Sequence, residues 1–283
     1  MNLSFLERKS LELKIDIVSA IHRAQSGHIG AALSCLDILV ALYYGKFTTG
    51  PIVKFDAKKP GWDKQDYVFL SKGSAVVSLY AILADLGFFD KKELRSFRQI
   101  NSLLQGYLSR RVPGVLYTAG PKADAFAIAC GTAVSLKNDK ADNRVFTVLA
   151  DSELQDGLIW EACMSAAHYR CDNLIAIVDN SGLQSEAYIR GIVNVQPVQS
   201  KFEAFGWKVF HVLDGHDYGE IIGALSKAIR VKGQPVCIWA HTVSARGVPF
   251  AEAKPSYYNS VLSDAELDEL MPILNRQLED LKS

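Results

Sequence analysis

The sequence predicts an α/β fold, built as a mostly parallel sheet with helices on both faces. Short apolar runs of strand length recur along the chain, and segments with apolar residues at helical spacing separate several of them. Strands that alternate with helices form parallel sheets through crossover connections. Nearly half of the 283 residues are apolar, so a sizeable core is possible.

The first part of the chain predicts two helices before the first strand. Apolar residues at helical spacing predict a helix over residues 4–26, and the apolar run at residues 34–44 predicts a second one. The apolar run at residues 67–70 predicts a buried strand. The Ser-Lys-Gly-Ser sequence at residues 71–74 ends that strand before a helix over residues 75–86.

The remaining strands are predicted from four more apolar runs, at residues 145–149, 174–178, 208–212 and 236–240. The last segment opens with Ser-Asp-Ala-Glu at residues 263–266, which is a helix start, so residues 263–281 are predicted to be helical. No change in composition marks a linker. We therefore expect residues 1–283 to form a single domain.

The composition excludes several classes of protein. Lys and Arg number 31 and balance 31 Asp and Glu, without a basic stripe for nucleic acid. The first 14 residues lack the apolar region of a signal peptide, and no apolar run reaches membrane-spanning length. The five cysteines are an odd number without metal-ligand spacing, so we expect reduced thiols and a cytoplasmic location.

The most informative chemical signal is Asp151, which directly follows one apolar strand run. The next run ends in Asp-Asn-Ser at residues 179–181. The ends of parallel strands meet at one edge of a sheet, where α/β folds bind phosphorylated cofactors. A carboxylate, a neutral side-chain oxygen and a backbone carbonyl suit Mg²⁺, which takes oxygen ligands from the protein and from substrate phosphates at the same time. The pattern predicts a metal–diphosphate clamp, whereas the alternative role for Asp151 is a helix N-cap.

Seven stretches, in order along nearly the whole chain, resemble the N-terminal half of transketolase. They are Ser-Gly-His-Ile-Gly at 26–30, Asp-Ile-Leu at 37–39, Leu-Ser-Lys-Gly at 70–73, Trp-Glu-Ala at 160–162 with Ala-Ala-His at 166–168, Asp-Asn-Leu at 172–174, Phe-Glu-Ala-Phe-Gly-Trp at 202–207 and Asp-Gly-His-Asp at 214–217. The resemblance implies a thiamine diphosphate-binding fold of the diphosphate-binding domain type. It also implies thiamine diphosphate and Mg²⁺ as cofactors.

The resemblance assigns roles to individual residues. His28 matches the family's histidine near the reactive carbon of the cofactor, so it is expected to be catalytic. The implied metal ligands are Asp151, Ser181 and the backbone carbonyl of Leu183. The family usually has Asn where this chain has Ser181. Asn180 stands one residue earlier, and a one-residue shift in the loop would make it the ligand instead. The full set expected to bind the cofactor is Gly120, Asp151, Ser152, Glu153, Asn180, Ser181 and Leu183.

The chain also departs from the family's pattern at three histidines. Ser74, Tyr107 and Tyr258 stand where the family has histidine, and Ala150 and Ser152 replace glycines on either side of the metal-binding acid. Histidine transfers protons near neutral pH, whereas serine does not and tyrosine titrates near pH 10. The departures predict a divergent active site with an unusual donor or acceptor.

The family's glycine-rich stretch is altered as well, to Gly-Pro-Lys-Ala-Asp-Ala at residues 120–125. Lys122 and Asp124 have entered a region that faces the cofactor in the family. Two readings stay open: both residues are new catalytic or substrate-binding groups, or they form a solvated ion pair on a relaxed loop.

Two functions follow from these observations. As the diphosphate-binding subunit of a split transketolase, the chain would transfer a two-carbon ketol or acyl unit. It would act with a second subunit that carries the pyrimidine-binding and C-terminal transketolase domains, in a heterotetramer. Alternatively, the chain is a catalytically degenerate homologue that acts as a structural or regulatory partner. A nicotinamide-binding domain is disfavoured because no Gly-x-Gly-x-x-Gly follows a first strand.

Overall fold

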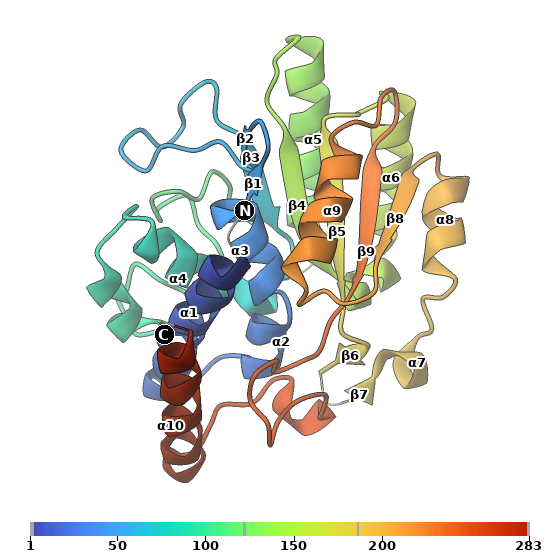
Figure 1. Ribbon diagram of the computed structural model, residues 1–283. Helices are drawn as coiled ribbons and strands as arrows, with labels where there is room; N and C mark the ends of the chain where they lie inside the picture. Colours follow the sequence, from blue (N-terminus) through green and yellow to red (C-terminus); the bar gives the residue numbers. More distant parts are fainter. Residues whose placement is uncertain (1–2, 121–122, 186, 282–283) are drawn as a thin grey trace.

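A parallel five-stranded sheet forms the centre of the chain. The structure is a computed structural model that describes residues 3–120, 123–185 and 187–281. The strand order is β3-β4-β5-β9-β8, and every neighbouring pair is parallel (Figure 1). The five predicted strands are confirmed, with ends that differ by no more than two residues; they are β3 (Tyr67–Leu70), β4 (Val145–Ala150), β5 (Leu174–Asn180), β8 (Lys208–Val212) and β9 (Val236–His241).

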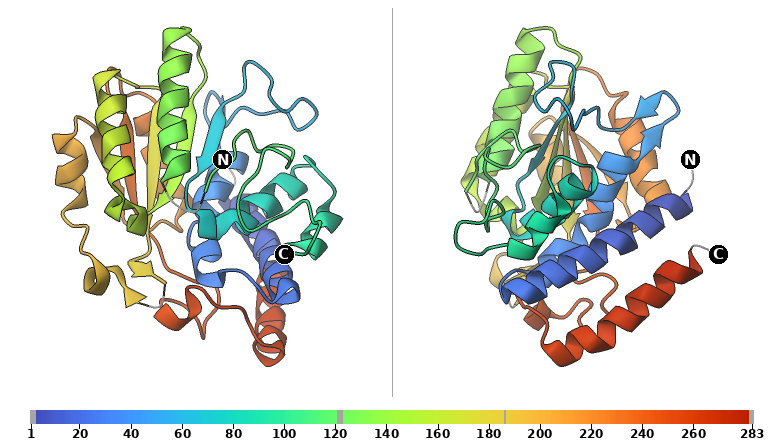
Figure 2. Two further views of the ribbon diagram at one scale, coloured as in Figure 1. Left: turned by 180° about the vertical axis from the view of Figure 1, so that it is seen from behind. Right: turned by 90° about the vertical axis from the view of Figure 1, so that its left-hand side faces the viewer.

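Helices cover both faces of this sheet. In Figure 1, α9 (Tyr218–Ala228) crosses in front of the strands, and the view from behind in Figure 2 shows α5 (Asp124–Asn138) and α6 (Gly157–His168) over the other face. The strand β4 is buried along its whole length, as a strand covered on both faces must be. The predicted α/β class with helices on both faces is therefore confirmed.

The N-terminal helices pack beside the first strand. The helix α1 (Leu3–Ala24) ends two residues earlier than predicted, because Gln25 and Gly27 have positive φ angles of 45° and 149°. The predicted single helix over residues 34–44 is wrong at its start. Ser34 ends α2 (Ile29–Ser34), and α3 (Leu36–Tyr44) begins after Cys35, whose ψ of 2° interrupts the helix.

The other elements are short, apart from two helices. The helix α4 (Val76–Asp85) follows a 3₁₀ turn that takes up the start of the predicted helix. The C-terminal helix α10 (Asp264–Asp280) lies alongside α1 in Figure 2, and Ser263 and Glu266 form its capping box. The remaining elements are β1 (Lys46–Phe47), β2 (Gly50–Pro51), η1 (Gly73–Ala75), η2 (Lys91–Ser96), η3 (Asp151–Gln155), β6 (Leu183–Gln184), β7 (Ala187–Tyr188), α7 (Ile189–Ile192), α8 (Val198–Ala204) and η4 (Pro255–Tyr257).

The carboxyl ends of β3, β4, β5 and β9 meet at one edge of the sheet, the lower edge in Figure 1. The register places Ala150 opposite Asp179 and Asn180 opposite His241. The polar residues that follow these four strands are therefore neighbours in space, although more than 170 positions separate Ser71 from Thr242 in the sequence.

Two further expectations concern the chain as a whole. All five cysteines are free and buried, in agreement with the predicted reduced thiols. In the part of the chain that the structure describes, no helix has the length and apolar character needed to cross a bilayer.

Candidate functional site

Asp151 lies at the tip of β4 with one carboxylate oxygen in use and one unused. Its side chain is completely buried. The Oδ2 atom accepts a hydrogen bond from the backbone amide of Gly182 at 2.7 Å, whereas Oδ1 is buried without a partner. The N-cap positions of η3 and α6 belong to Ala150 and Asp156, so the alternative N-cap role for Asp151 is wrong.

The surroundings of Asp151 disfavour its charge. Burial raises the pKa of Asp151 to about 7, the negative charge of Asp179 adds to this effect, and the positive charge of Lys72 opposes it. A buried carboxylate oxygen with no hydrogen-bond donor is costly, and a bound cation would remove that cost. This unsatisfied oxygen is the feature expected of a metal ligand.

The loop after β5 offers two candidates for the second metal ligand. The side-chain nitrogen of Asn180 donates to the Nδ1 atom of His241 at 2.9 Å, and its Oδ1 atom, which is the atom able to bind a metal, takes no part in this contact. The hydroxyl of Ser181, in contrast, is buried and has no hydrogen-bond partner. Because the Gly182 amide holds Asp151 against this loop, Ser181 and the carbonyl of Leu183 flank the point of contact. The buried, unpartnered hydroxyl favours Ser181, and Asn180 stays the alternative ligand through its Oδ1 atom.

This donor set fits Mg²⁺ joined to a diphosphate. One carboxylate oxygen, one hydroxyl and one backbone carbonyl are all oxygen ligands, and they leave room for phosphate oxygens in an octahedral shell. Across residues 3–120, 123–185 and 187–281, no group of three or more His, Cys, Asp or Glu side chains could hold a metal alone.

A buried ion pair between Lys72 and Asp179 lies at the strand ends next to the site. The ammonium group of Lys72 contacts the Oδ2 atom of Asp179 at 2.6 Å and donates to the hydroxyl of Ser34 at 2.7 Å, and Thr242 donates to the other Asp179 oxygen. Burial is the largest single influence and lowers the pKa of Lys72, but the charge of Asp179, together with Tyr258, Cys35 and the hydrogen bond to Asp179, raises the pKa above its usual value.

Sequence reasoning did not select Lys72 or Asp179 as site residues. The available signal was their position, since each lies at or just beyond the end of a central strand. Their pairing over 107 positions could not be read from the sequence.

A cavity of about 280 Å³ lies beside these strand ends. We call it the main cavity because His28 lines it, although two other cavities, of about 410 and 440 Å³, are larger. Its lining includes His28, Lys72, Ser74, Arg98, Ser152 and Tyr258. Burial lowers the pKa of His28, and the positive charge of Arg98 lowers it further. The Nδ1 atom of His28 is buried without a partner, while the residue as a whole lines this cavity.

The three positions where histidine was expected converge on the main cavity. Ser74, Tyr107 and Tyr258 all contribute to its lining. Tyr258 is almost fully buried, and the ammonium group of Lys72 lies 5.6 Å from the centre of its ring. The three replaced histidines are thus gathered at one place.

Glu153 connects the loops around the cavity. One carboxylate oxygen accepts from the hydroxyl of Ser71 and from the amide of Ala123, and the other accepts from the amide of Ala150 at 2.6 Å. Burial raises the pKa of Glu153, and these hydrogen bonds oppose that effect. The predicted cofactor-binding residues Glu153 and Ser152 both line the cavity.

The described part of the glycine-rich stretch holds Asp124 away from the main cavity. Asp124 is exposed, accepts from the amide of Gly120 at 3.2 Å, and does not line the main cavity. A Cβ on Gly120 would lie 2.6 Å from that same carboxylate. This local contact is the one that the described residues give for Asp124, and its catalytic role stays a prediction. Lys122 lies outside the described residues, and so does the proposed ion pair between it and Asp124.

Gly30 lets the segment that carries Tyr258 approach α2. A Cβ on Gly30 would lie 2.5 Å from the hydroxyl of Ser244 and 2.7 Å from the Cα atom of Tyr258. We expect Gly30→Ala to displace this segment and to lower the midpoint of urea unfolding by an amount equivalent to about 1–3 kcal/mol. Gly131→Ala is the matched control, since its Cβ would meet nothing within 4 Å. Equal stability of the two variants would refute the close approach.

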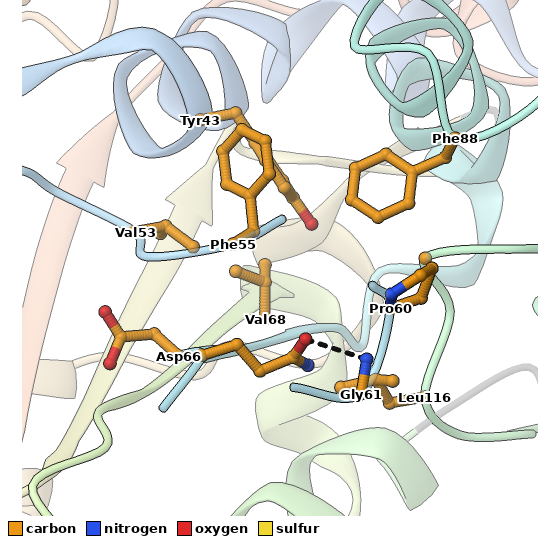
Figure 3. Close-up of a pocket in the computed structure, with 11 residues that line it drawn as sticks. Tyr43, Val53, Phe55, Pro60, Gly61, Asp66, Val68, Phe88 and Leu116 are labelled. Atoms are coloured by element: carbon orange, nitrogen blue, oxygen red, sulfur yellow. Dashed lines mark hydrogen bonds between the residues drawn. The ribbon is translucent and has the colours of Figure 1, made fainter. Parts of the chain in front are cut away.

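A separate hollow between α3 and β3 is too small to compete as a cofactor site. Figure 3 shows aromatic rings of Tyr43, Phe55 and Phe88 around it, and the dashed line marks the hydrogen bond from the Gly61 amide to Gln65. Its volume of about 20 Å³ is enough for roughly one water molecule.

Comparison with known proteins identifies relatives along almost the whole chain. Residues 9–277 match the family described as transketolase, thiamine diphosphate binding domain. The 6-deoxy-6-sulfo-D-fructose transketolase subunit SqwG of Clostridium sp. (strain MSTE9) is 35% identical over 239 residues, which cover 84% of each chain. The apulose-4-phosphate transketolase of Phocaeicola vulgatus has a subunit that is 28% identical over 282 residues, which cover 100% of this chain and 98% of that one.

Solved structures agree with this assignment. The crystal structure of transketolase from Campylobacter jejuni superposes with a TM-score of 0.89 at 30% identity. The match covers 99% of this chain but only 43% of the other. The chain therefore spans less than half of the transketolase chains of known structure, and nearly all of a relative that is named as a subunit.

Proposed function

This chain belongs to the family of transketolase thiamine diphosphate binding domains, and on that premise we propose that it is the diphosphate-binding subunit of a split transketolase-like transferase. Together with a partner chain it transfers a two-carbon ketol or acyl unit between small substrates. The observation that carries the proposal is the buried, unpartnered Oδ1 atom of Asp151 beside the loop that holds Ser181.

The proposal gives each residue of the site a task. Asp151, Ser181 and the carbonyl of Leu183 hold Mg²⁺, which anchors the diphosphate. Thiamine diphosphate supplies the nucleophilic carbon, so the protein's contribution is to place and polarise it. His28 is kept neutral by burial and by Arg98, and its imidazole lines the main cavity, where it can exchange a hydrogen bond or a proton with a substrate hydroxyl.

A partner chain completes the site in this proposal. It supplies the pyrimidine-binding and C-terminal transketolase domains, with the glutamate that activates the cofactor, in a heterotetramer in the cytoplasm. The names of two relatives support it, since both are described as transketolase subunits and a subunit acts with at least one other chain.

The substrate is proposed to differ from ordinary ketose phosphates. Ser74, Tyr107 and Tyr258 replace three histidines around the main cavity, so the groups that contact substrate hydroxyls have changed their proton chemistry. The two relatives named above act on different sugars, 6-deoxy-6-sulfo-D-fructose and apulose 4-phosphate. Because the substrates of these relatives differ, this chain can also have a substrate of its own.

Calorimetric titration of the chain and its partner with thiamine diphosphate tests the proposal. We expect one cofactor to bind per pair of subunits in the presence of Mg²⁺, and no binding when the metal is chelated. Ketol transfer by the reconstituted pair should require both subunits. Absence of binding with both subunits and Mg²⁺ present would instead favour the structural or regulatory homologue.

A further inference from the structure

The guanidinium group of Arg98 reaches the main cavity without a protein partner. Arg98 follows η2 and lines the cavity together with His28 and Tyr107. No acidic side chain among the described residues forms an ion pair with Arg98. The Arg98 side chain also donates no hydrogen bond to any described residue. A half-buried cation in this situation has its hydrogen-bonding capacity left for a ligand.

The backbone holds Arg98 in a conformation that needs support. Its φ angle is 58°, in the left-handed region that residues other than glycine rarely adopt. The amide of Arg98 donates to the carbonyl of Leu104 at 2.8 Å, which stabilises this turn. Strained backbone of this kind concentrates at functional sites, because the surrounding structure must hold it in place.

Gly106 provides the surface on which the guanidinium lies. A Cβ at this position would stand 2.9 Å from one terminal nitrogen of Arg98 and 3.0 Å from its Nε atom. Only a residue without a side chain permits so close an approach. The strained turn and the glycine therefore act together to place one planar cation at the wall of the cavity.

The other charged groups around the cavity already have partners. Lys72 is paired with Asp179 at 2.6 Å, and the carboxylate of Glu153 accepts three hydrogen bonds from the protein. Arg98 is thus the charge that these groups leave uncompensated, and it faces His28 closely enough to affect that imidazole.

We propose that Arg98 is an oxyanion subsite, at which the carboxylate, phosphate or sulfonate of a small substrate binds beside His28. The planar fork of a guanidinium matches such groups with two parallel hydrogen bonds. The proposal rests on the proposed function only for the statement that the ligand is the enzyme's substrate. It assigns to this subunit, rather than to its partner, one determinant of substrate choice.

An NMR titration of the full chain tests the subsite without turnover. The imidazole signal of His28 is identified from its absence in His28→Gln, and inorganic phosphate, sulfate and acetate are the probes, with chloride keeping the ionic strength constant. We expect at least one oxyanion to shift this signal in the wild type. Arg98→Gln should weaken that response about tenfold or more, since hydrogen bonds to charged groups contribute roughly 1.5–3 kcal/mol.

The control variant is Arg95→Gln, three residues earlier on η2 and exposed away from the main cavity. It should leave the response of His28 unchanged. The proposal is overturned if no oxyanion perturbs His28, or if Arg98→Gln responds as the wild type does. An intact oxyanion response in a chain that binds no cofactor would overturn the proposed function and leave this subsite standing.

Donor kinetics of the reconstituted pair separate the sources of the oxyanion. The donors are hydroxypyruvate, with a carboxylate, fructose 6-phosphate, with a phosphate, and uncharged erythrulose. Arg98→Gln should raise the KM of the donor whose anion binds at Arg98 by about tenfold or more and leave the KM of erythrulose unchanged. An equal rise for all three donors would contradict a role in recognising charge.

Discussion

Replacing Asp151 with asparagine is expected to abolish Mg²⁺-dependent binding of thiamine diphosphate and to stabilise the ligand-free chain. Asparagine can still accept the hydrogen bond from Gly182, so the loop contact remains. It cannot supply the negative charge that a divalent cation requires. Loss of a ligand should exceed the roughly 10- to 100-fold drop in affinity that follows loss of a ligand's outer hydrogen-bond partner.

The stability change follows from the pKa of Asp151, which burial raises from 3.8 to about 7 in the folded chain. A folded-state pKa above the unfolded value means that the folded chain binds the proton more tightly. Its stability therefore falls as pH rises from about 4 to 7, and it stays lower above that range. Asp151→Asn does not lose stability in this way, so at pH 8 it should unfold at a higher urea concentration than the wild type. The expected increase in the free energy of unfolding is on the order of a few kcal/mol.

Asp142→Asn is the control, because Asp142 is exposed just before the opposite end of β4. It should bind the cofactor normally and show wild-type stability across this pH range. If Asp151→Asn retained metal-dependent binding, or if it were less stable than the wild type at pH 8, Asp151 would not be the metal ligand described above.

Replacing Lys72 with methionine should give the largest loss of stability of the variants considered. The substitution leaves the carboxylate of Asp179 fully buried without its counter-charge, although the hydroxyls of Ser34 and Thr242 still donate to it. Breaking a buried pair in this way costs about 3–5 kcal/mol. Urea unfolding at pH 7 measures it.

Two further variants separate the buried charge from other effects. Adding Asp179→Asn to Lys72→Met should restore much of the lost stability, because no charge is then left uncompensated. Lys92→Met removes an exposed lysine whose contact with Asp90 is 3.8 Å long, and it should cost less than about 1 kcal/mol. A cost for Lys72→Met no greater than that of Lys92→Met would show that the buried pair contributes little.

The sheet could be predicted closely because its strands are apolar along their length and end in polar residues. The run that became β4 is buried at every position, and the acid at its tip marks the edge where strand ends meet. The break at Cys35 could not be predicted in the same way. An apolar cysteine carries no signal of a helix end, and packing of α2 and α3 on the core decides the local backbone.

The position of the acid at the end of β4 could be predicted from the sequence. The directions and contacts of the other side chains of the site could not. Asn180 and Ser181 are adjacent in the sequence, and only the buried, unpartnered hydroxyl of Ser181 distinguishes them as candidate ligands. The left-handed turn at Arg98 and the surface that Gly106 offers it depend on tertiary contacts. The family resemblance identified the diphosphate-binding half, whereas these contacts arise where this chain departs from its relatives or where sequence patterns are silent.

The most direct test of the account is a crystal structure of the chain and its partner with thiamine diphosphate and Mn²⁺ in place of Mg²⁺. The anomalous signal of Mn²⁺ locates the metal independently of the ligand. We expect the metal within roughly 2.0–2.3 Å of the Asp151 Oδ1 atom, with the Ser181 hydroxyl and diphosphate oxygens also bound to it. A structure in which the cofactor is bound while Asp151 makes no contact with metal or diphosphate would contradict the account.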